Sequence, residues 1–490
     1  MLTELSYIWP ELVILTGGLI LFILPLKSSR TLGLLTLAVL AAGFNLAVLR
    51  LLDGPFSQRI FSGMVVQDRF SHFFQIAILG SMFLVVLGLL GYRREKLHGR
   101  REVYGLLLLV TVGLLFMVGA QSLVLIYIAL ELVSIFSYLL TGMLKKEVLS
   151  TEAGLKYFLF GALATGVMLY GISLLYGLTS TMDLEVLSEI FPRVMARFPV
   201  LCGIALFLLT AGLGFKVALV PFHMWAPDAY EGAPTPVAAF ISTAPKLAGF
   251  AVLVRFFLVA LTPDVTLWPV LLGYLAVLTM TVGNLAALAQ ENVKRLLAYS
   301  SIAHAGTIAI GLAVATPGGL TATMYYLIAY LLMNTGAFLG VIAVGNESGG
   351  REDIGAFSGL SRRQPALAFM MTVALLSLAG IPPLAGFFAK MWVFGAALQA
   401  GAVGLAVIGA VNSIMAVFYY LKIVKAMYLD PAPAGFSTSV PVGLSLKVAL
   451  LLCVAGVFLA GLMPGQVLVL SGDALPVSVQ LGDLPWLPGR

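Results

Sequence analysis

The chain has 490 residues, of which 60% are hydrophobic and only 10% are charged, and its formal net charge is +6. Soluble domains are about 45–50% apolar and about 25% charged. The composition therefore excludes a soluble globular enzyme, a disordered chain and a nucleic-acid-binding protein. Because a spanning helix needs about 20 apolar residues, it favours an all-α polytopic membrane protein with about 14 transmembrane helices.

Fourteen apolar segments follow one another along the chain and are separated mostly by short loops. They lie near residues 11–26, 32–52, 73–91, 104–119, 122–141, 157–177, 200–221, 236–259, 267–288, 297–315, 320–344, 366–399, 402–424 and 446–464. Short loops make neighbouring spans antiparallel, so we expect one membrane domain over residues 1–490. The sequence contains no convincing strand, and the first segment lacks the positive flank of a cleaved signal peptide.

Lysine and arginine are distributed unequally between the two sets of loops. With the N-terminus outside, eighteen fall on the cytoplasmic side: Lys27, Arg30, Arg93, Arg94, Lys96, Arg100, Arg101, Lys145, Lys146, Lys156, Lys294, Arg295, Arg351, Arg362, Arg363, Lys422, Lys425 and Lys447. Seven fall on the opposite side: Arg50, Arg59, Arg69, Arg193, Arg197, Arg255 and Arg490. The positive-inside rule then predicts that both termini lie outside.

Four ionisable residues are expected within the spans: Glu131, Lys216, Lys246 and Lys390. A charge at the bilayer centre costs about 2.5–3.5 kcal/mol on insertion scales. Snorkelling to the membrane surface is the alternative, and it has more weight for Lys216 and Lys390, which are close to helix breaks. We expect the four side chains to face inward, to pair or alternate with one another, and to mark an ion or proton route.

Proline and glycine predict breaks in spans 7 and 12. The first break follows Val220 in the sequence VPFHMWAP, and the second is the sequence GIPPLAG at residues 380–386. Proline removes a backbone donor, and broken backbone at membrane depth is tolerated only where it is buried in protein or lines a cavity. A simple proline kink is the alternative for either break alone, but two breaks near buried lysines favour a functional site.

The two breaks also indicate an internal repeat. Spans 7 and 12 are five apart and so have opposite directions, which predicts two inverted five-helix repeats at residues 104–259 (spans 4–8) and 267–428 (spans 9–13). A Met-Trp pair follows both His223 and Lys390, 167 positions apart (390 minus 223), which supports the repeat.

The histidines and cysteines narrow the chemistry. His72 and His98 lie at span edges, where we expect solvation, whereas His223 at the first break and His304 inside span 10 are candidate proton relays. Packing through hydrogen bonds is an equal alternative for His304. The two cysteines are too few for an iron–sulfur or zinc site, and no nucleotide-binding loop is present, so we expect a secondary transporter or a translocating subunit driven by partners.

At residues 215–236 the sequence FKVALVPFHMWAPDAYEGAPTP resembles the signature of the antiporter-like subunits of respiratory complex I. Its continuation at 239–250, AFISTAPKLAGF, is similar to the subunit N group, which is the NADH dehydrogenase subunit 2 family. The segment NL at 284–285 and the segment QENVKRLLAYSSIAHAG at 290–306 resemble the core that these subunits share. The likeness extends over nearly the whole chain.

The resemblance implies a proton-translocating membrane-arm subunit of NADH:quinone oxidoreductase, located in the bacterial cell inner membrane. It implies that NADH, FMN, iron–sulfur clusters and quinone are bound by partner subunits and that this chain binds no cofactor or metal. The expected partners are the antiporter-like subunit M, the small subunit K and the lipid bilayer.

The resemblance also implies roles for the four buried charges. Separation of Glu131 from Lys216 would favour proton loss from the lysine, Lys246 would pass the proton centrally, and Lys390 would exchange it with one aqueous side. A lysine at position 390 argues against subunit M, which has a glutamate there, and the short segment after the last span argues against subunit L. A subunit of a multisubunit sodium/proton antiporter and a purely structural arm subunit remain as alternatives.

Overall fold

The computed structural model describes residues 2–26, 28–52, 57–93, 101–261, 267–432 and 442–475. The side chains of residues 2, 3, 258 and 259 are not part of this description. The expectations for Lys27, Arg94, Lys96, His98, Arg100 and Arg490 lie outside the described residues.

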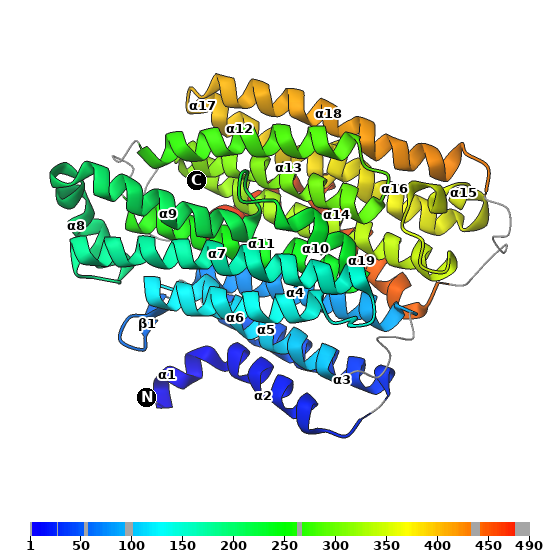
Figure 1. Cartoon of the computed structure of the whole chain (residues 1–490), viewed down its shortest axis with the longest axis horizontal. Helices are drawn as coiled ribbons and strands as arrows, with labels where there is room; N and C mark the ends of the chain where they lie inside the picture. The colour runs from blue at the N-terminus through cyan, green and yellow to red at the C-terminus, as the bar shows by residue number, and fades with distance from the viewer. Residues whose placement is uncertain are drawn as a thin grey trace.

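Helices lie side by side along the long axis of the molecule (Figure 1). The N-terminal half contains α1 (Leu2–Leu5), a 3-10 turn (Ser6–Ile8), α2 (Trp9–Ile23), α3 (Ser29–Leu52), β1 (Ser57–Ile60), β2 (Val65–Asp68), α4 (Arg69–Gly91), α5 (Arg101–Gly119), α6 (Leu123–Thr141), α7 (Val148–Thr179), α8 (Leu184–Arg197), α9 (Pro199–Val217), α10 (Trp225–Gly232), α11 (Thr235–Arg255) and a π-helical turn (Phe256–Ala260). The C-terminal half contains α12 (Leu267–Leu288), α13 (Val293–Ala313), α14 (Pro317–Glu347), a 3-10 turn (Ile354–Phe357), α15 (Leu360–Arg363), α16 (Pro365–Ala379), α17 (Ala385–Gln399), α18 (Val403–Tyr428), α19 (Leu444–Leu462) and α20 (Pro464–Asp473).

The number of spans follows the sequence prediction. In the described part of the chain, 13 helical segments are long and apolar enough to cross a membrane. The predicted span 12 is divided into α16 and α17, of 15 residues each, and completes the set of fourteen. The all-α polytopic fold is therefore confirmed.

Both predicted breaks occur where the sequence places them. Helix α9 ends before Ala218, which has a left-handed backbone with φ 61°, and Pro221 lies in the turn before α10. Helix α16 ends before Gly380, with φ 88°, and Pro382 and Pro383 separate it from α17. Proline has no N–H to continue a helix, so each segment ends in buried backbone carbonyls that lack a partner in the next turn of the helix.

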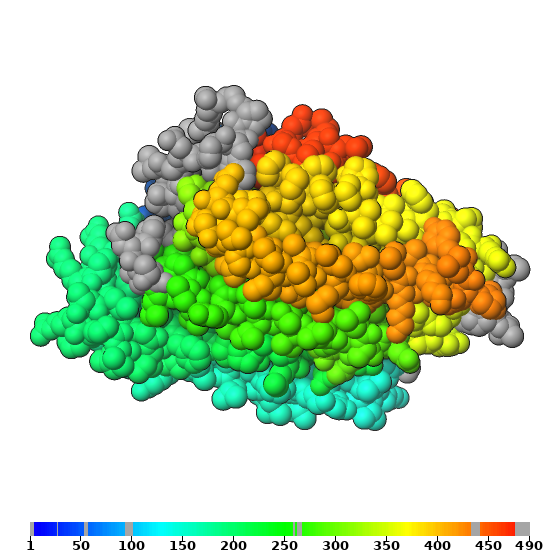
Figure 2. Space-filling model, turned by 90° about the horizontal axis from the view of Figure 1, so that it is seen from above, coloured from blue at the N-terminus to red at the C-terminus, as the bar shows by residue number. Residues whose placement is uncertain are grey.

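The core of the bundle is formed by α11, α13 and α14. All 21 residues of α11 are buried, although the helix contains Lys246. The N-terminal helices α2 and α3 lie at one edge of the bundle and α17 and α18 at the other (Figure 1), and α18, in orange, runs along the outside (Figure 2). Two of the polar residues singled out from the sequence, Lys246 and His304, therefore lie on the most buried helices, while exposed apolar side chains cover the outer helices.

Two sequence expectations are wrong near the start of α4, one in the loop before the helix and one in its first turn. Strands β1 and β2 form a short antiparallel hairpin, with Ser57 paired to Asp68, where no strand was expected. His72 is buried rather than solvated, and its Nδ1 lies 3.0 Å from Gln75 Oε1. The Nε2 of the same glutamine donates to Glu11 Oε1 at 2.8 Å, so the histidine belongs to a polar cluster inside the apolar bundle.

Two backbone bridges have equivalent places in the two halves of the chain. Ser122 before α6 pairs with Asp183 after α7, and Asn292 before α13 pairs with Asp353 after α14. Each bridge spans 61 residues (183 minus 122, and 353 minus 292). Each is flanked by two backbone hydrogen bonds of 2.8–3.0 Å.

Candidate functional site

The centre of the candidate site is Lys246 on α11. Its side chain is 1% exposed, and Nζ donates to the backbone oxygen of Ser301 at 2.7 Å and to Ser301 Oγ at 2.5 Å. The Tyr330 hydroxyl donates to the same Oγ at 2.7 Å, and the Tyr230 hydroxyl lies 3.4 Å from it. In the described residues Lys246 has no carboxylate partner, so hydroxyl and carbonyl groups alone hold this buried amine.

His304 lies one turn after Ser301 on α13, on the same side of the helix. Its Nδ1 is 2.8 Å from the Tyr326 hydroxyl and its Nε2 is 3.1 Å from the Tyr420 hydroxyl. Tyr420 also forms a hydrogen bond with Ser300 Oγ. A neutral imidazole has one donor and one acceptor nitrogen, so one tyrosine donates to it and the other accepts. Both predicted roles for His304, packing and relay, are compatible with this geometry.

Lys390 on α17 lies at the carbonyl end of α16. Its Nζ donates to Leu378 O at 3.2 Å and to Ala379 O at 2.8 Å. The negative end of a helix dipole stabilises a nearby cation, so the break supplies a site for the ammonium group. A cavity of about 10 Å³, room for about one water molecule, is lined by both Lys390 and His304.

Lys216 lies at the end of α9, immediately before the first break, and is 1% exposed. Its Nζ donates to Ser134 Oγ on α6 at 3.2 Å. In the part of the chain that is described, it forms no direct ion pair with Glu131, which lies one turn before Ser134. Glu131 is half-buried, whereas Lys216, Lys246 and Lys390 are buried. On its helix Ile128 and Ile135 are 57% and 50% exposed, so Glu131 lies beside a bare apolar face.

The sites of Lys216 and Lys246 are close but not joined by a hydrogen bond among the described residues. Helices α9 and α11 approach closely at Gly249, where an added Cβ would lie 2.6 Å from Val217 Cγ1 and 3.5 Å from Lys216 Cγ.

His223 is in the turn of the first break, and no described hydrogen bond joins it to Lys216 or Lys246. Its buried Nδ1 has no described partner. Unlike Lys390, which lies inside α17, His223 precedes α10, so the two Met-Trp pairs are not in equivalent places.

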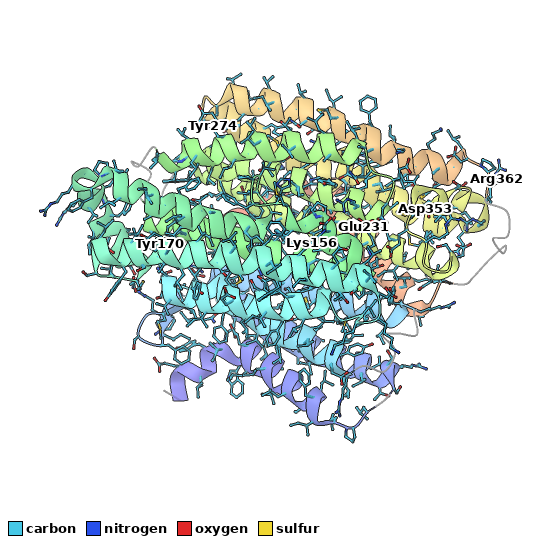
Figure 3. The ribbon with its side chains drawn as sticks, in the orientation of Figure 1. Lys156, Tyr170, Glu231, Tyr274, Asp353 and Arg362 are labelled. Carbon is cyan, nitrogen blue, oxygen red and sulfur yellow. The ribbon has the colours of Figure 1, made fainter. Side chains whose placement is uncertain are left out.

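Ion pairs join the short helix α10 to the neighbouring helices α7 and α13. Asp228 accepts from Lys156 of α7 at 2.8 Å and from Arg295 of α13 at 2.7 Å, and Glu231 accepts from Arg295 at 2.8 Å. Lys156 and Glu231 are labelled in Figure 3. This charge cluster holds the far side of the first break against the second half of the chain.

A buried ion pair holds the C-terminal end of α11 in place. Arg255 is 2% exposed and donates to both carboxylate oxygens of Asp68, at 2.7 and 3.2 Å, and to Val118 O at 2.8 Å. Burial raises the pKa of Asp68, but Arg255 and the hydrogen bonds of Ser71 outweigh burial and hold it below its ordinary value. The stability that this carboxylate contributes is therefore present at neutral pH and is lost as the pH falls through the lowered pKa.

We expect Arg255→Met to lower the free energy of unfolding by about 3–5 kcal/mol, because it leaves the Asp68 carboxylate buried without its partner. The double variant Asp68→Asn/Arg255→Met should recover part of that loss. The measurement is the thermal midpoint of the purified membrane complex. Equal thermal midpoints for wild type and the Arg255→Met variant would show that the ion pair does not contribute to stability.

Sequence reasoning missed the hydroxyl groups that hold the buried amines. Ser301 accepts from Lys246, Tyr420 forms a hydrogen bond with His304, and Tyr330 donates to Ser301. The spacing of Ser301 and His304 was a usable signal, since residues three apart share a helix face. The tyrosines come from α14 and α18, and only tertiary packing brings them there. The described residues contain no group of three or more His, Cys, Asp or Glu side chains arranged to hold a metal.

Known proteins identify the class of this fold. Residues 120–416 match the family described as NADH:quinone oxidoreductase/Mrp antiporter, TM. A chain of the Mrp complex from Dietzia sp. DQ12-45-1b superposes with a TM-score of 0.86 over 98% of this chain and 100% of that chain, at 24% identity, which shows the fold alone. The protein is an antiporter-like, multi-pass membrane subunit.

Sequence relatives define the family more closely. NADH-quinone oxidoreductase subunit N 2 of Sorangium cellulosum is 44% identical over 452 residues, which cover 87% of this chain and 89% of the relative. Subunit N of Trichlorobacter lovleyi is 41% identical over 482 residues, covering 96% and 97%. A chain of respiratory complex I from Thermus thermophilus with bound Aureothin is 36% identical, with a TM-score of 0.79 and coverage of 94% and 99%. The chain belongs to the subunit N family of NADH-quinone oxidoreductases.

Proposed function

We propose that this chain translocates protons as a membrane-arm subunit of NADH:quinone oxidoreductase, while partner subunits pass electrons from NADH to quinone. The observation that carries the proposal is a buried amine, Lys246, held only by hydroxyl and carbonyl groups in the most buried helix of the bundle. An ionisable group at this depth is costly and marks an ion or proton site. Relatives named as subunit N support the same function.

The proposed proton sites form a row with two halves. Glu131 and Lys216 belong to the first half, and the lysine donates to Ser134, which lies one turn after Glu131 on α6. Lys246 is the central site, and its contact with Ser301 leads to the helix that carries His304. The water-sized cavity between His304 and Lys390 supports a connection to the second break. His223 has no described hydrogen bond to any of these residues, so we assign it at most a secondary role in proton transfer.

A proton moves along this row when a carboxylate and an amine change their separation. Glu131 near Lys216 favours the charged amine, and separation favours proton release. The carbonyl end of α16 offers Lys390 a comparable stabilisation for its charged form. Proton transfer between these sites balances without any redox step in this chain, because the lysines and the carboxylate only gain or lose a proton.

The proposed inverted repeats are residues 104–259 and 267–428. The two bridges of 61 residues, the similar lengths of α7 and α14, and the break in the fourth span of each repeat support this division. Under this proposal each half carries one broken helix and one buried lysine beside it. We further propose both termini outside, subunits M and K as neighbours, and NADH, FMN, iron–sulfur clusters and quinone in the rest of the complex.

The function is tested by purifying the assembled complex through an affinity tag on this chain. We expect NADH:quinone reductase activity to copurify and, in proteoliposomes, to drive acidification that does not change when sodium is replaced by potassium. Sodium-dependent proton exchange without NADH would instead assign the chain to a multisubunit sodium/proton antiporter, for which the likeness to the Mrp complex is evidence of fold only.

A further inference from the structure

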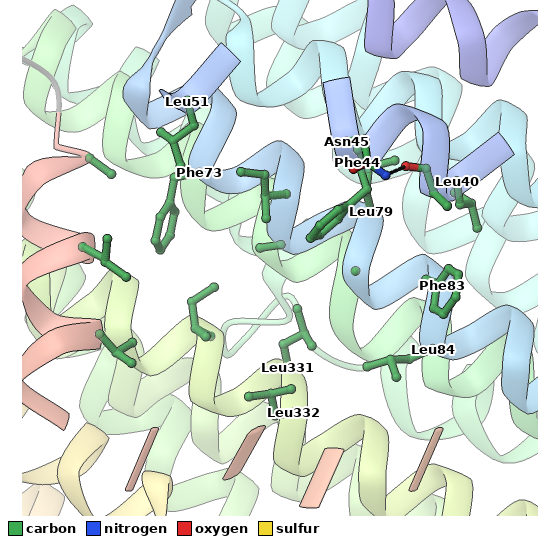
Figure 4. A pocket seen from close by; sticks show the side chains of 18 of the residues that line it. Leu40, Phe44, Asn45, Leu51, Phe73, Leu79, Phe83, Leu84, Leu331 and Leu332 are labelled. Carbon is green, nitrogen blue, oxygen red and sulfur yellow. Dashed lines mark hydrogen bonds between the residues drawn. The ribbon is translucent and has the colours of Figure 1, made fainter. Parts of the chain in front are cut away.

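A large apolar cavity lies apart from the row of proposed proton sites. It has a volume of about 890 Å³ and is lined by side chains of α3, α4, α14, α19 and α20, including Phe44, Phe73, Phe83 and Leu331 (Figure 4). The cavity is half open at the outer surface of the bundle, where Leu52 and Leu470 of its lining are 74% and 61% exposed, and an apolar space does not hold water stably. A cavity of this size, at the upper end of the range of about 300–1,000 Å³ for ligand pockets, therefore indicates an apolar occupant.

Two charged side chains line the cavity, Arg69, the first residue of α4, and Asp473, the last residue of α20, and Leu51 and Leu52 at the end of α3 also line it. The third polar residue of the lining, Asn45, lies about two turns earlier on α3. The Nε of Arg69 is buried and has no hydrogen-bond partner among the described residues. The Arg69 side chain as a whole is partly exposed and lines the cavity, and a guanidinium in that position is suited to a phosphate oxygen, because Arg binds phosphate through several donors in one plane.

The length of the cavity fits a lipid acyl chain. Its lining on α4 extends from Arg69 to Leu84, which is about 22 Å at about 1.5 Å per residue. One leaflet of the hydrocarbon core is about 15 Å thick, half of about 30 Å. A chain whose headgroup lies at Arg69 would therefore reach the bilayer centre near Leu79, and the cavity is long enough to hold it as far as Leu84.

We propose that this cavity holds one glycerophospholipid, with its phosphate on the Arg69 guanidinium and an acyl chain along α4. The lipid would fill the space between the N-terminal helices α3 and α4 and the C-terminal helices α19 and α20. It would add to the direct packing of α4 on α19 near Gly91 and Leu446 and act as part of the fold rather than as exchanging bilayer lipid.

The test uses the assembled complex in nanodiscs with two photoactivatable probes that carry the same diazirine acyl chain. One is a phosphatidylethanolamine and the other is a diacylglycerol without phosphate. We expect the phospholipid to label α4 and α20 peptides about tenfold more than the diacylglycerol, the effect of one charge-assisted hydrogen bond. Equal labelling by the two probes overturns the phosphate site, and no labelling of these peptides shows that residues 476–490 or a neighbouring subunit fill the cavity instead.

Matched variants separate the headgroup from the acyl chain. Arg69→Gln should remove the preference for the phospholipid probe, with Arg193→Gln on α8 as the control.

Gly80→Leu should remove labelling itself, because an added Cβ there meets only Phe44 at 3.9 Å and the longer side chain enters the cavity. Gly166→Leu is the control, since it adds the same side chain where nothing lies within 4 Å. Unchanged labelling in the assembled Gly80→Leu complex contradicts the proposal, and the two-probe comparison on wild type stands even if a variant does not assemble.

Discussion

Replacing Lys246 with methionine is expected to lower the NADH-driven proton-pumping rate of the assembled complex by more than about tenfold. The amine is the only described ionisable side chain of α11 in the middle of the bundle, and without it a proton would cross this depth as a bare charge. On insertion scales such a charge costs about 2.5–3.5 kcal/mol, which corresponds to more than a tenfold slower step. Methionine is similar in volume and removes a buried charge, so we expect the complex to assemble.

A second variant at this position separates charge from proton transfer. Lys246→Arg keeps a positive side chain that can still donate to Ser301, but a guanidinium does not release its proton in proteins. We therefore expect assembled Lys246→Arg complex to pump as poorly as Lys246→Met. Pumping close to wild type in the arginine variant would mean that the residue acts only by its charge. Lys422→Met is the matched control, because that lysine is exposed near the end of α18.

Replacing Lys216 with methionine should also lower pumping by more than about tenfold, since it removes the amine next to the first break. Glu131→Gln should have a smaller effect, a few-fold, because the carboxylate is half-buried and is not in direct contact with the lysine. The measurement is the initial rate of NADH-driven acidification in proteoliposomes, normalised to assembled complex. Lys146→Met, on an exposed loop residue, is the control.

The double variant Glu131→Gln/Lys216→Met tests whether the two residues act together. If the carboxylate works through the amine, the double variant should pump no worse than Lys216→Met alone. Additive losses would mean that Glu131 has a separate role, for example at the bare apolar face of α6 beside Ile128 and Ile135. Wild-type pumping by the assembled Lys216→Met complex would remove Lys216 from the route.

Hydropathy and proline placement predicted most of the fold. Fourteen spans, and breaks before Pro221 and around Pro382, follow from the length of apolar runs and from the missing proline N–H. The hairpin of β1 and β2 was not predicted because four-residue strands in a loop leave no hydropathy signal. The burial of His72 was missed because the polar cluster around it depends on packing between helices: His72 bonds to Gln75, which in turn bonds to Glu11 on another helix.

The candidate site was predicted as a set of ionisable residues and not as a geometry. Depth in the span was enough to single out Lys216, Lys246 and Lys390, because an isolated charge is costly in an apolar segment. Depth alone does not give the exposed fraction of a side chain, so the sequence did not show that Glu131 is less buried than the three lysines. The hydroxyl groups of Ser301 and Tyr330 were also missed, because such residues most often serve helix packing.

The most direct test of proton translocation through this chain is the pumping rate of a complex in which all four charged sites are neutral: Glu131→Gln, Lys216→Met, Lys246→Met and Lys390→Met together. The assembled complex is measured in proteoliposomes with NADH and quinone. We predict a proton-pumping rate more than about tenfold below wild type. A wild-type rate in this variant would contradict the account and would make the chain a structural part of the membrane arm.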